Sequence, residues 1–252
     1  MNQANTLLNK TILITRPLGR EVHLRQLIEQ AGGKVIHYPV ISINPPTDLE
    51  IEQLTQLREQ LQTFTMAIFI SPTAVEQSQL YFPVLPEHLS IASIGKKTTR
   101  ALEQYHINVD IEAPEYSSES LLKTKAFQVP EIQGQRILIF RGNGGLAHLG
   151  DTLIKRSAQI RYVETYQRQR PSRPPLTLQQ IKMLDAVTVS SSEGLENLIT
   201  LMEDPGLLIN IPLIVPSTRS VALARQHGFK HIVAATNATD EATVLTLNDC
   251  FN

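Results

Sequence analysis

The sequence predicts an α/β protein built from parallel sheets with helices on both faces. Short apolar runs alternate with stretches of helical spacing along the whole chain of 252 residues. The second half of the chain repeats the pattern of the first, and proline-bearing stretches interrupt it at equivalent places in the two halves. Such alternation of strands and helices is typical of parallel sheets that are buried on both sides.

Ten apolar runs are predicted to form strands. They lie at residues 11–15, 35–38, 66–71, 90–94 and 109–113 in the first half, and at 136–140, 159–163, 186–190, 212–215 and 231–234 in the second. Between them, apolar residues recur at the spacing of one helix face, as Leu24, Leu27, Ile28 and Ala31 do. Most strands are therefore expected to be followed by a helix.

The two halves resemble each other segment by segment. The stretch TILITRPLGREVHL parallels RILIFRGNGGLAHL, and Arg16 is matched to Arg141. MAIFISPTAVEQ parallels AVTVSSSEGLEN, and Ser71 is matched to Ser190. Each copy has about 120 residues, which is enough for a hydrophobic core of its own. The repeat therefore predicts two similar lobes.

Two stretches with several prolines, residues 38–46 and 166–175, occupy equivalent places in the two copies. Proline fixes its own φ and disfavours helix in the residue before it, so both stretches are predicted to be extended connections. Two crossings would tether the lobes around a cleft, which is a common place for a ligand.

The composition narrows the classes of function. The formal net charge is −1, Trp is absent and aromatic residues make up 5%, which argues against a nucleic-acid partner. The single Cys250 allows no internal disulfide, and the histidines show no metal-ligand spacing such as H-E-x-x-H. No apolar run approaches the roughly 18 residues that cross a bilayer, and no signal-peptide pattern is visible. We therefore expect a cytoplasmic protein that binds no metal and does not bind the membrane.

The stretch RGNGGLA leaves three interpretations open. Gly142, Gly144 and Ala147 satisfy the spacing G-x-G-x-x-G/A of a dinucleotide-binding turn, and Glu164 follows about 20 residues later. Against this, the equivalent turn in the first copy, TRPLGRE, has a single glycine. The turn can equally be a plain strand-to-helix connection, or an anion site in which backbone N–H groups at a helix N-terminus act together with Arg141.

Hydroxyl and basic side chains follow several predicted strands, at the points where helices begin. Such a serine or threonine often caps the helix by accepting a hydrogen bond from an otherwise unpaired N–H group. Because the carboxyl ends of parallel strands gather at one edge of a sheet, these groups would also meet there and suit a ligand with several carboxylates or phosphates. The candidates for ligand contacts are Arg16, Ser71, Lys96, Thr98, Arg141, Ser190, Ser191, Ser217 and Ser220.

Taken together, these motifs resemble the uroporphyrinogen-III synthase family. The resemblance is carried by ILITRP near the start, FISPTAV, SIGKKTTRAL, and RGNGG with the later YQR. VPSTRSVALARQHGF and ATNATDEATVL add to it near the end. The segments are spread in order over essentially the whole chain, and the bacterial members of the family are the most similar.

The resemblance implies two flavodoxin-like domains joined by a two-stranded linker. It also implies an exchange, in which the first βα unit packs with the C-terminal units and not with its neighbours in sequence. Domain 1 would comprise residues 1–36 and 170–252, and domain 2 would comprise residues 46–161. Residues 37–45 and 162–169 would form the linker strands.

The family's reaction starts from hydroxymethylbilane, a linear tetrapyrrole with eight carboxylates. The enzyme removes water from the hydroxymethyl group, inverts ring D and closes the macrocycle as uroporphyrinogen III, without a cofactor or metal. This is a task of positioning and of stabilising a developing cation. The resemblance therefore implies a small-molecule substrate, and we expect a monomer.

The resemblance also assigns roles to individual residues. Tyr166 of VETYQR is a candidate proton donor or positioning group. Thr98 matches the family's threonine of G-x-x-T, and Ser71 matches its serine of F-x-S. The groups that would hold the substrate's carboxylates are Arg16, Lys96, Arg141 and the backbone amides of the turn that contains Gly142 and Asn143.

Two residues depart from the family and leave the exact ligand contacts open, and two other classes of protein remain as alternatives. Ser217 stands where the family usually has a glycine, and Ser220 where it usually has a threonine. One alternative is a dinucleotide-dependent oxidoreductase that uses the turn at Gly142. The other is a bilobal small-molecule binding or sensor protein.

Overall fold

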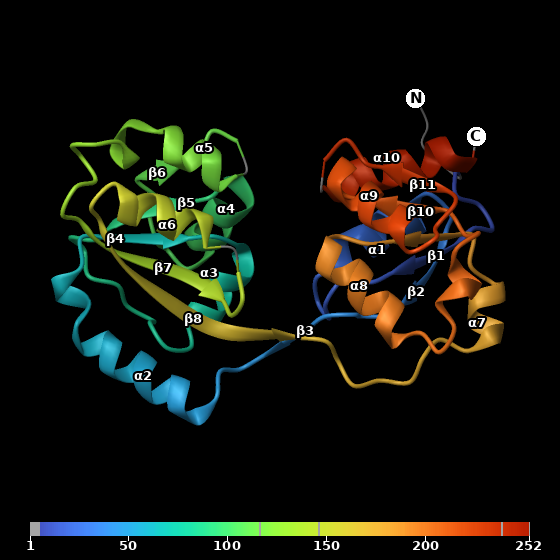
Figure 1. Ribbon diagram of the computed structural model, residues 1–252, viewed down its shortest axis with the longest axis horizontal. Coiled ribbons are helices and arrows are strands. Elements are labelled where there is room, and N and C mark those ends of the chain that lie inside the picture. Colours follow the sequence, from blue (N-terminus) through green and yellow to red (C-terminus); the bar gives the residue numbers. More distant parts are fainter. Residues whose placement is uncertain (1–5, 116, 146, 238, 252) are drawn as a thin grey trace. The chain divides into compact units, whose positions relative to one another are not determined.

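A computed structural model describes residues 6–115, 117–145, 147–237 and 239–251, and for Arg219 the backbone alone. The chain divides into two compact units. Unit 1 is Met1–Ser42 with Gln169–Asn252, and unit 2 is Ile43–Arg168. Each unit contains one sheet with helices packed against it (Figure 1). The predicted fold class, α/β with parallel sheets, is confirmed.

Unit 2 contains a six-stranded sheet in the order β3-β8-β7-β4-β5-β6. Its strands are β3 (Ser42–Asn44), β4 (Met66–Phe69), β5 (Ser90–Ser93), β6 (Ile111–Glu112), β7 (Arg136–Gly142) and β8 (Gln159–Gln169). Its helices are α2 (Asp48–Glu59), η1 (Leu61–Thr63), α3 (Pro72–Ser78), α4 (Lys96–Gln104), α5 (Ser118–Lys123), η2 (Lys125–Phe127) and α6 (His148–Lys155). The pairs β8-β7, β7-β4, β4-β5 and β5-β6 are all parallel.

The core of unit 2 follows from the two-residue period of its strands. In β4, Ala67 and Phe69 face the layer that contains α2, α3 and α4, whereas Met66 and Ile68 face the layer that contains α5 and α6. Phe69 stacks on Phe140 of β7, with ring centroids 4.5 Å apart. Both faces of the sheet are therefore buried at its centre, which explains why β4 and the middle of β7 are apolar.

Unit 1 contains a five-stranded sheet in the order β11-β10-β9-β1-β2, and all its strand pairs are parallel. Its strands are β1 (Thr11–Ile14), β2 (Lys34–His37), β9 (Ala186–Thr188), β10 (Leu213–Val215) and β11 (Ile232–Ala234). Its helices are α1 (Val22–Gln30), α7 (Leu178–Lys182), α8 (Ser192–Leu201), η3 (Pro205–Leu208), α9 (Thr218–Gln226) and α10 (Asp240–Phe251). Helices α1 and α10 pack together against one face, where Leu24 and Leu247 meet Ile12 and Ile14.

The two sheets have the same strand order once their strands are matched by the internal repeat. β1 and β2 correspond to β7 and β8, and β9, β10 and β11 correspond to β4, β5 and β6. β1 pairs with β9, and β7 pairs with β4. Each unit therefore combines the first part of one copy with the second part of the other.

Several strands end earlier than predicted, because the hydroxyl residues after them begin helices. β4 ends at Phe69 and β9 at Thr188. Ser71 and Ser191 then cap α3 and α8, accepting hydrogen bonds from the third residue on at 3.0 Å each. The match of Ser71 to Ser190 is therefore wrong by one residue, and Ser191 is the equivalent of Ser71.

The predicted boundary between a strand and a linker strand near residue 162 is absent from the structure. The expected strand at 159–163 and the expected linker strand at 162–169 form the single strand β8. The first proline-bearing stretch, predicted as an extended connection, contains the short strand β3 at its end, which pairs with β8.

Within unit 1, the two proline-bearing stretches are fastened to each other. The Arg173 guanidinium lies 3.8 Å from the centroid of the Tyr38 ring and donates to the carbonyl oxygen of Pro39 at 3.1 Å. The Tyr38 hydroxyl donates to the carbonyl oxygen of Pro174 at 2.9 Å. Burial raises the pKa of the Tyr38 phenol, although the Arg173 charge acts in the opposite direction.

None of the helices in the described ranges is long and apolar enough to span a membrane.

The start of α2 is fastened to β8 through Glu50. Its Oε2 accepts hydrogen bonds from the backbone N–H of Thr47 at 2.7 Å, from the Thr47 hydroxyl at 2.8 Å and from Gln167 Nε2 at 2.7 Å. The bonds from Thr47 are the main reason that the pKa of Glu50 lies below its ordinary value.

We predict that Glu50→Gln destabilises the protein in a pH-dependent way. A pKa that is lower in the folded than in the unfolded chain contributes stability above the unfolded value, about 4.3, and loses it as the pH falls through the folded value. Because the carboxylate is accessible to solvent, the loss at pH 7 should be a few tenths of a kcal/mol. Chemical denaturation at neutral and acidic pH measures it. Glu52→Gln, on the same helix, is the control, and an equal pH response of the two variants would contradict the prediction.

Candidate functional site

In unit 2, the parallel strands bring most of the predicted site residues of this unit to one edge of the sheet. Ser71 follows β4, Lys96 begins α4 after β5, and Gly142 is the last residue of β7. Tyr166 lies in β8 beside Gly142. Because the carboxyl ends of parallel strands point in the same direction, these residues share the edge at which α3 and α4 begin.

Tyr166 is fixed at this edge by its ring and by its hydroxyl. It is 4% exposed and belongs to the core between the sheet and α2, α3 and α4. Its Oη lies 3.4 Å from Ser71 Oγ, and either hydroxyl can donate. Ser71 Oγ also accepts the N–H of Ala74 as the N-cap of α3. The phenol oxygen is thus held beside the N-terminus of α3, where the helix dipole is positive.

Gly142 is a glycine because the Tyr166 ring lies against its α-carbon. A Cβ atom at this position would be 2.5 Å from Tyr166 Cε2 and 2.6 Å from Cζ. The next residue continues the pairing with β8: the Asn143 N–H donates to the Tyr166 carbonyl oxygen at 3.1 Å, and Asn143 Oδ1 accepts the Arg168 N–H at 2.7 Å. Gly142 and Asn143 therefore place Tyr166, while their contacts with substrate stay a prediction.

The glycine-rich turn after β7 is filled by its own arginine. Arg141 is 4% exposed, its guanidinium lies 4.7 Å from the Tyr162 ring centroid, and its Nε donates to the Gly142 carbonyl oxygen at 3.1 Å. The same Nε lies 3.6 Å from Glu164 Oε1. A Cβ on Gly145 would be 2.6 Å from Arg141 Nη2.

This packing favours one of the three interpretations of the turn. The room that Gly145 leaves is taken by the Arg141 side chain, which faces Glu164. The Asn143 N–H is used by β8, so an anion site at this turn would depend on other backbone N–H groups, and it stays a prediction. The geometry supports a packed strand-to-helix connection and does not fit a dinucleotide-binding turn.

Lys96 and Thr98 lie in the first turn of α4, whose N-cap is Gly95. Lys96 is exposed, whereas Thr98 is 2% exposed. The N–H groups of Thr98 and Thr99 both donate to the Gly95 carbonyl oxygen, at 2.9 and 3.1 Å. The Lys96 ammonium is therefore open to an anion, and a contact of Thr98 with substrate stays a prediction.

In unit 1, serine hydroxyls form a connected group at the carboxyl ends of β9 and β10. Ser217 caps α9, and its Oγ lies 3.3 Å from the Oγ of Ser220, which is 2% exposed. Ser192 Oγ lies 3.4 Å from the same Ser220 Oγ. Ser191 caps α8, and Ser190 is exposed. The predicted substrate contacts included Ser190 and Ser191 but not Ser192, which follows them directly in the sequence.

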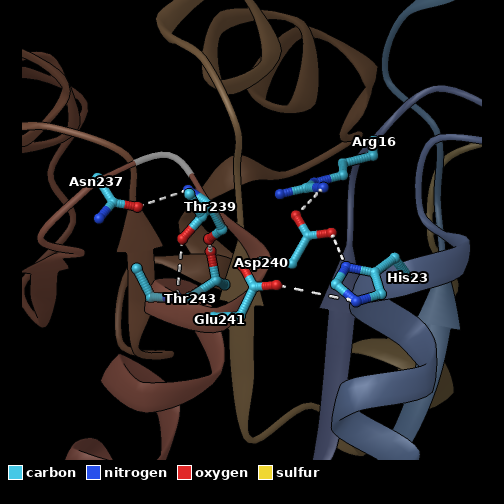
Figure 2. A network of polar contacts seen from close by, with 8 residues as sticks. Arg16, His23, Asn237, Thr239, Asp240, Glu241 and Thr243 are labelled. Atoms are coloured by element: carbon cyan, nitrogen blue, oxygen red, sulfur yellow. Dashed lines mark hydrogen bonds and ion pairs between the residues drawn. The ribbon is translucent and has the colours of Figure 1, made fainter. Parts of the chain in front are cut away.

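Arg16, which follows β1, places a positive charge at this edge, and it is paired with an acid. Its Nη1 lies 2.5 Å from Asp240 Oδ1, and His23 Nδ1 lies 2.7 Å from Asp240 Oδ2 (Figure 2). His23 Nε2 is 3.9 Å from Glu241 Oε1. Sequence reasoning missed Asp240 and His23. The available signal was an acid at the start of the last predicted helix, within the segment TDEATVL.

A neighbouring histidine fastens the main chain of the same turn. His37 Nε2 lies 2.8 Å from the Arg16 carbonyl oxygen, and His37 Nδ1 lies 3.5 Å from Glu21 Oε1.

Across the described ranges, no three side chains of His, Cys, Asp or Glu are grouped so that they could hold a metal ion.

Two α/β units with hydroxyls, cations and helix N-termini at the carboxyl ends of their strands are typical of enzymes that bind small anionic molecules. A family model described as "Uroporphyrinogen-III synthase HemD" matches residues 22–244. The uroporphyrinogen-III synthase of Escherichia coli (strain K12) is 31% identical, over 94% of this chain and 99% of its own length. That of Synechococcus elongatus is 30% identical, over 78% of this chain and 76% of its own length. The chain therefore belongs to the uroporphyrinogen-III synthase family.

Solved structures give the same fold. Uroporphyrinogen-III synthetase from Helicobacter pylori superposes with a TM-score of 0.62 at 14% identity, over 96% of this chain and 99% of its own. A mutant uroporphyrinogen III synthase from Thermus thermophilus superposes with a TM-score of 0.61 at 15% identity, over 95% and 98%. The resemblance inferred from the sequence is confirmed, and with it the enzyme class, a cyclising lyase of porphyrin biosynthesis.

We predict that Gly142→Ala displaces Tyr166. The added methyl group overlaps the ring, so the free energy of unfolding should fall by about 1–3 kcal/mol. Movement of the phenol by an ångström should lower turnover by about 10²-fold. Thermal or chemical denaturation and an activity assay measure the two effects.

The matched control is the same change in a Tyr166→Ala background. With the ring removed, the added methyl group should cost little stability. If Gly142→Ala costs as much there as in the wild type, the contact with Tyr166 is not its cause.

Proposed function

We propose that this chain converts hydroxymethylbilane into uroporphyrinogen III with inversion of ring D. Its membership of the uroporphyrinogen-III synthase family supports this reaction. The observation that carries the proposal within the structure is the placement of Tyr166, whose hydroxyl meets Ser71 while its ring lies on Gly142. A phenol in this fixed position is suited to a reaction that needs little acid–base chemistry and much orientation.

The Tyr166 hydroxyl is proposed to help the departure of water from the substrate. The C–O bond of the hydroxymethyl group breaks, and its oxygen leaves as water once it has accepted a proton from Tyr166 Oη. Ser71 can donate a hydrogen bond to the phenolate that remains, because its Oγ keeps its own proton while accepting the N–H of Ala74. In this role Ser71 also orients the phenol before reaction.

The substrate's acetate and propionate groups are proposed to bind at the carboxyl ends of the strands. Arg16 and Lys96 supply positive charge there, and the capped starts of α8 and α9 supply hydroxyl groups. The predicted contacts of Thr98, Arg141, Gly142 and Asn143 remain part of this proposal, with Arg141 and the turn acting chiefly through packing. The serines concerned are Ser190, Ser191, Ser217 and Ser220.

The functional domains are proposed to follow the two compact units. Residues 1–36 and 170–252 would act as domain 1, and residues 46–161 as domain 2, with residues 37–45 and 162–169 linking them. The division of the chain at residues 42–43 and 168–169 supports this assignment. A monomer in the cytoplasm, acting on hydroxymethylbilane without cofactor or metal, completes the proposal.

A coupled assay that generates hydroxymethylbilane and separates isomer III from isomer I tests the function directly. Closure without inversion is spontaneous and gives isomer I, so only the enzyme produces isomer III. Isomer III formed in proportion to the amount of enzyme is the expected result. Isomer I alone, at the spontaneous rate, would overturn the proposal.

We predict that Tyr166→Phe lowers kcat for isomer III by about 10²-fold and leaves the fold intact. The phenyl ring can occupy the same space on Gly142, while the proton donor is gone. Steady-state kinetics and thermal denaturation check the two parts. Unchanged turnover would remove Tyr166 from any acid role. Tyr81→Phe, a tyrosine of the same unit packed at the rim of the core, is the control.

A further inference from the structure

We propose that Asp240 is a positioning residue, which aims the Arg16 guanidinium so that its remaining N–H groups receive a carboxylate of the substrate. This inference rests on the proposed function. In that function Arg16 binds a carboxylate of the substrate. The inference adds that Asp240, which is buried, acts through Arg16, and that His23 holds Asp240 in place. Arg16 and Asp240 lie at opposite ends of the sequence and meet because β1 and α10 share the carboxyl edge of one sheet.

The position of Asp240 is built by its own segment. Thr239 caps α10: its Oγ1 accepts the N–H of Ala242 at 3.2 Å, and its carbonyl oxygen accepts the hydroxyl of Thr243 at 2.9 Å (Figure 2). Asn237 Oδ1 accepts the Thr239 N–H at 2.9 Å, which fixes the approach to the helix. Asp240 therefore sits in the first turn of α10, where the helix dipole favours a negative charge.

The carboxylate uses its two oxygens on two different groups. Oδ1 meets Arg16 Nη1 at 2.5 Å, and Oδ2 meets His23 Nδ1 at 2.7 Å. The Asp240 side chain is 5% exposed, so its partners hold it in one orientation. His23 comes from α1 and thereby couples the direction of the carboxylate to that helix.

Arg16 keeps hydrogen-bonding capacity after this pairing. A guanidinium has five N–H groups in a planar fork, and Asp240 is the acid that contacts the Arg16 guanidinium among the described residues. The Arg16 side chain is 15% exposed, so part of it remains open to a ligand. Because Asp240 already fixes one edge of the guanidinium, binding a carboxylate at the other edge costs less conformational entropy than it would for a freely rotating arginine.

The equivalent arginine of the other copy shows the contrast. Arg141 also faces an acid of its own unit, Glu164, but its side chain is 5% exposed and is covered by Tyr162 and the turn at Gly145. The repeat thus keeps an arginine beside an acid at the end of both strands. In unit 1 the arginine remains accessible, and in unit 2 it is buried. Arg16 is therefore the more accessible of the two arginines to a carboxylate of the substrate.

A double-mutant cycle tests the inference by its effect on KM. Asp240→Asn and Arg16→Gln are each expected to raise the KM for hydroxymethylbilane about tenfold, with kcat changed less than about twofold, because carboxylate binding is lost equally in the ground and transition states. In the Arg16→Gln background, Asp240→Asn should raise KM no further, since the acid acts through the arginine. A purely structural role of Asp240 would give the same rise in both backgrounds.

Asp185→Asn is the matched control, because Asp185 also forms an ion pair in unit 1, with Lys10 at 3.3 Å, at the opposite edge of the sheet. It should leave KM unchanged. Additive effects of Asp240→Asn and Arg16→Gln, or a KM lowered by Asp240→Asn because the acid competes with substrate, would overturn the inference. If the wild type forms no isomer III, the proposed function fails instead. Circular dichroism and the melting temperature confirm that each variant is folded.

Discussion

Parallel hydrogen bonding decides where chemistry can be placed in this chain. In every pair whose register is defined, the neighbouring strands run in the same direction, so all carboxyl ends within a unit emerge at one edge of its sheet. The N-termini of most α-helices emerge there as well, because these helices directly follow a strand. The hydroxyls, the cations and Tyr166 therefore gather by topology, even though long stretches of sequence separate them.

The second determinant is the way in which the charged groups are held. Neither arginine at a strand end is an isolated charge: Arg16 meets Asp240, and Arg141 meets Glu164. A partly buried guanidinium beside a carboxylate avoids the cost of an unpaired charge and keeps a defined direction. Similarly, the phenol of Tyr166 depends on the bare α-carbon of Gly142 and on the cap of α3. The reactive groups are thus positioned by structural contacts that also stabilise the fold.

Much of the fold was predictable, because strands buried on both faces are apolar throughout and the hydroxyl residues after them mark helix starts. The ends of the strands were less predictable. β4 and β9 stop shortly before Ser71 and Ser191, which are the N-caps of α3 and α8, and an apolar run alone does not reveal where such a cap lies. Tyr166 was found through the family resemblance, and Arg16 was found through its place after the first predicted strand. Asp240 and His23 were not, because their importance arises from the packing of α10 on α1, which no local pattern encodes. The glycines of RGNGG suggested a ligand, whereas Gly142 makes room for Tyr166, Gly145 makes room for Arg141, and Gly144 has a positive φ.

The pairing of β1 with β9 has a consequence for the order in which the protein is made. All residues of unit 2 have been synthesised once the chain reaches Arg168, so this unit can fold while synthesis continues. β1 and β2 can pair with each other early, but β9, the other neighbour of β1, lies beyond unit 2 in the sequence. One side of β1 therefore stays without its neighbouring strand until Ile43–Arg168 has been made, so this strand needs protection from aggregation in the nascent chain.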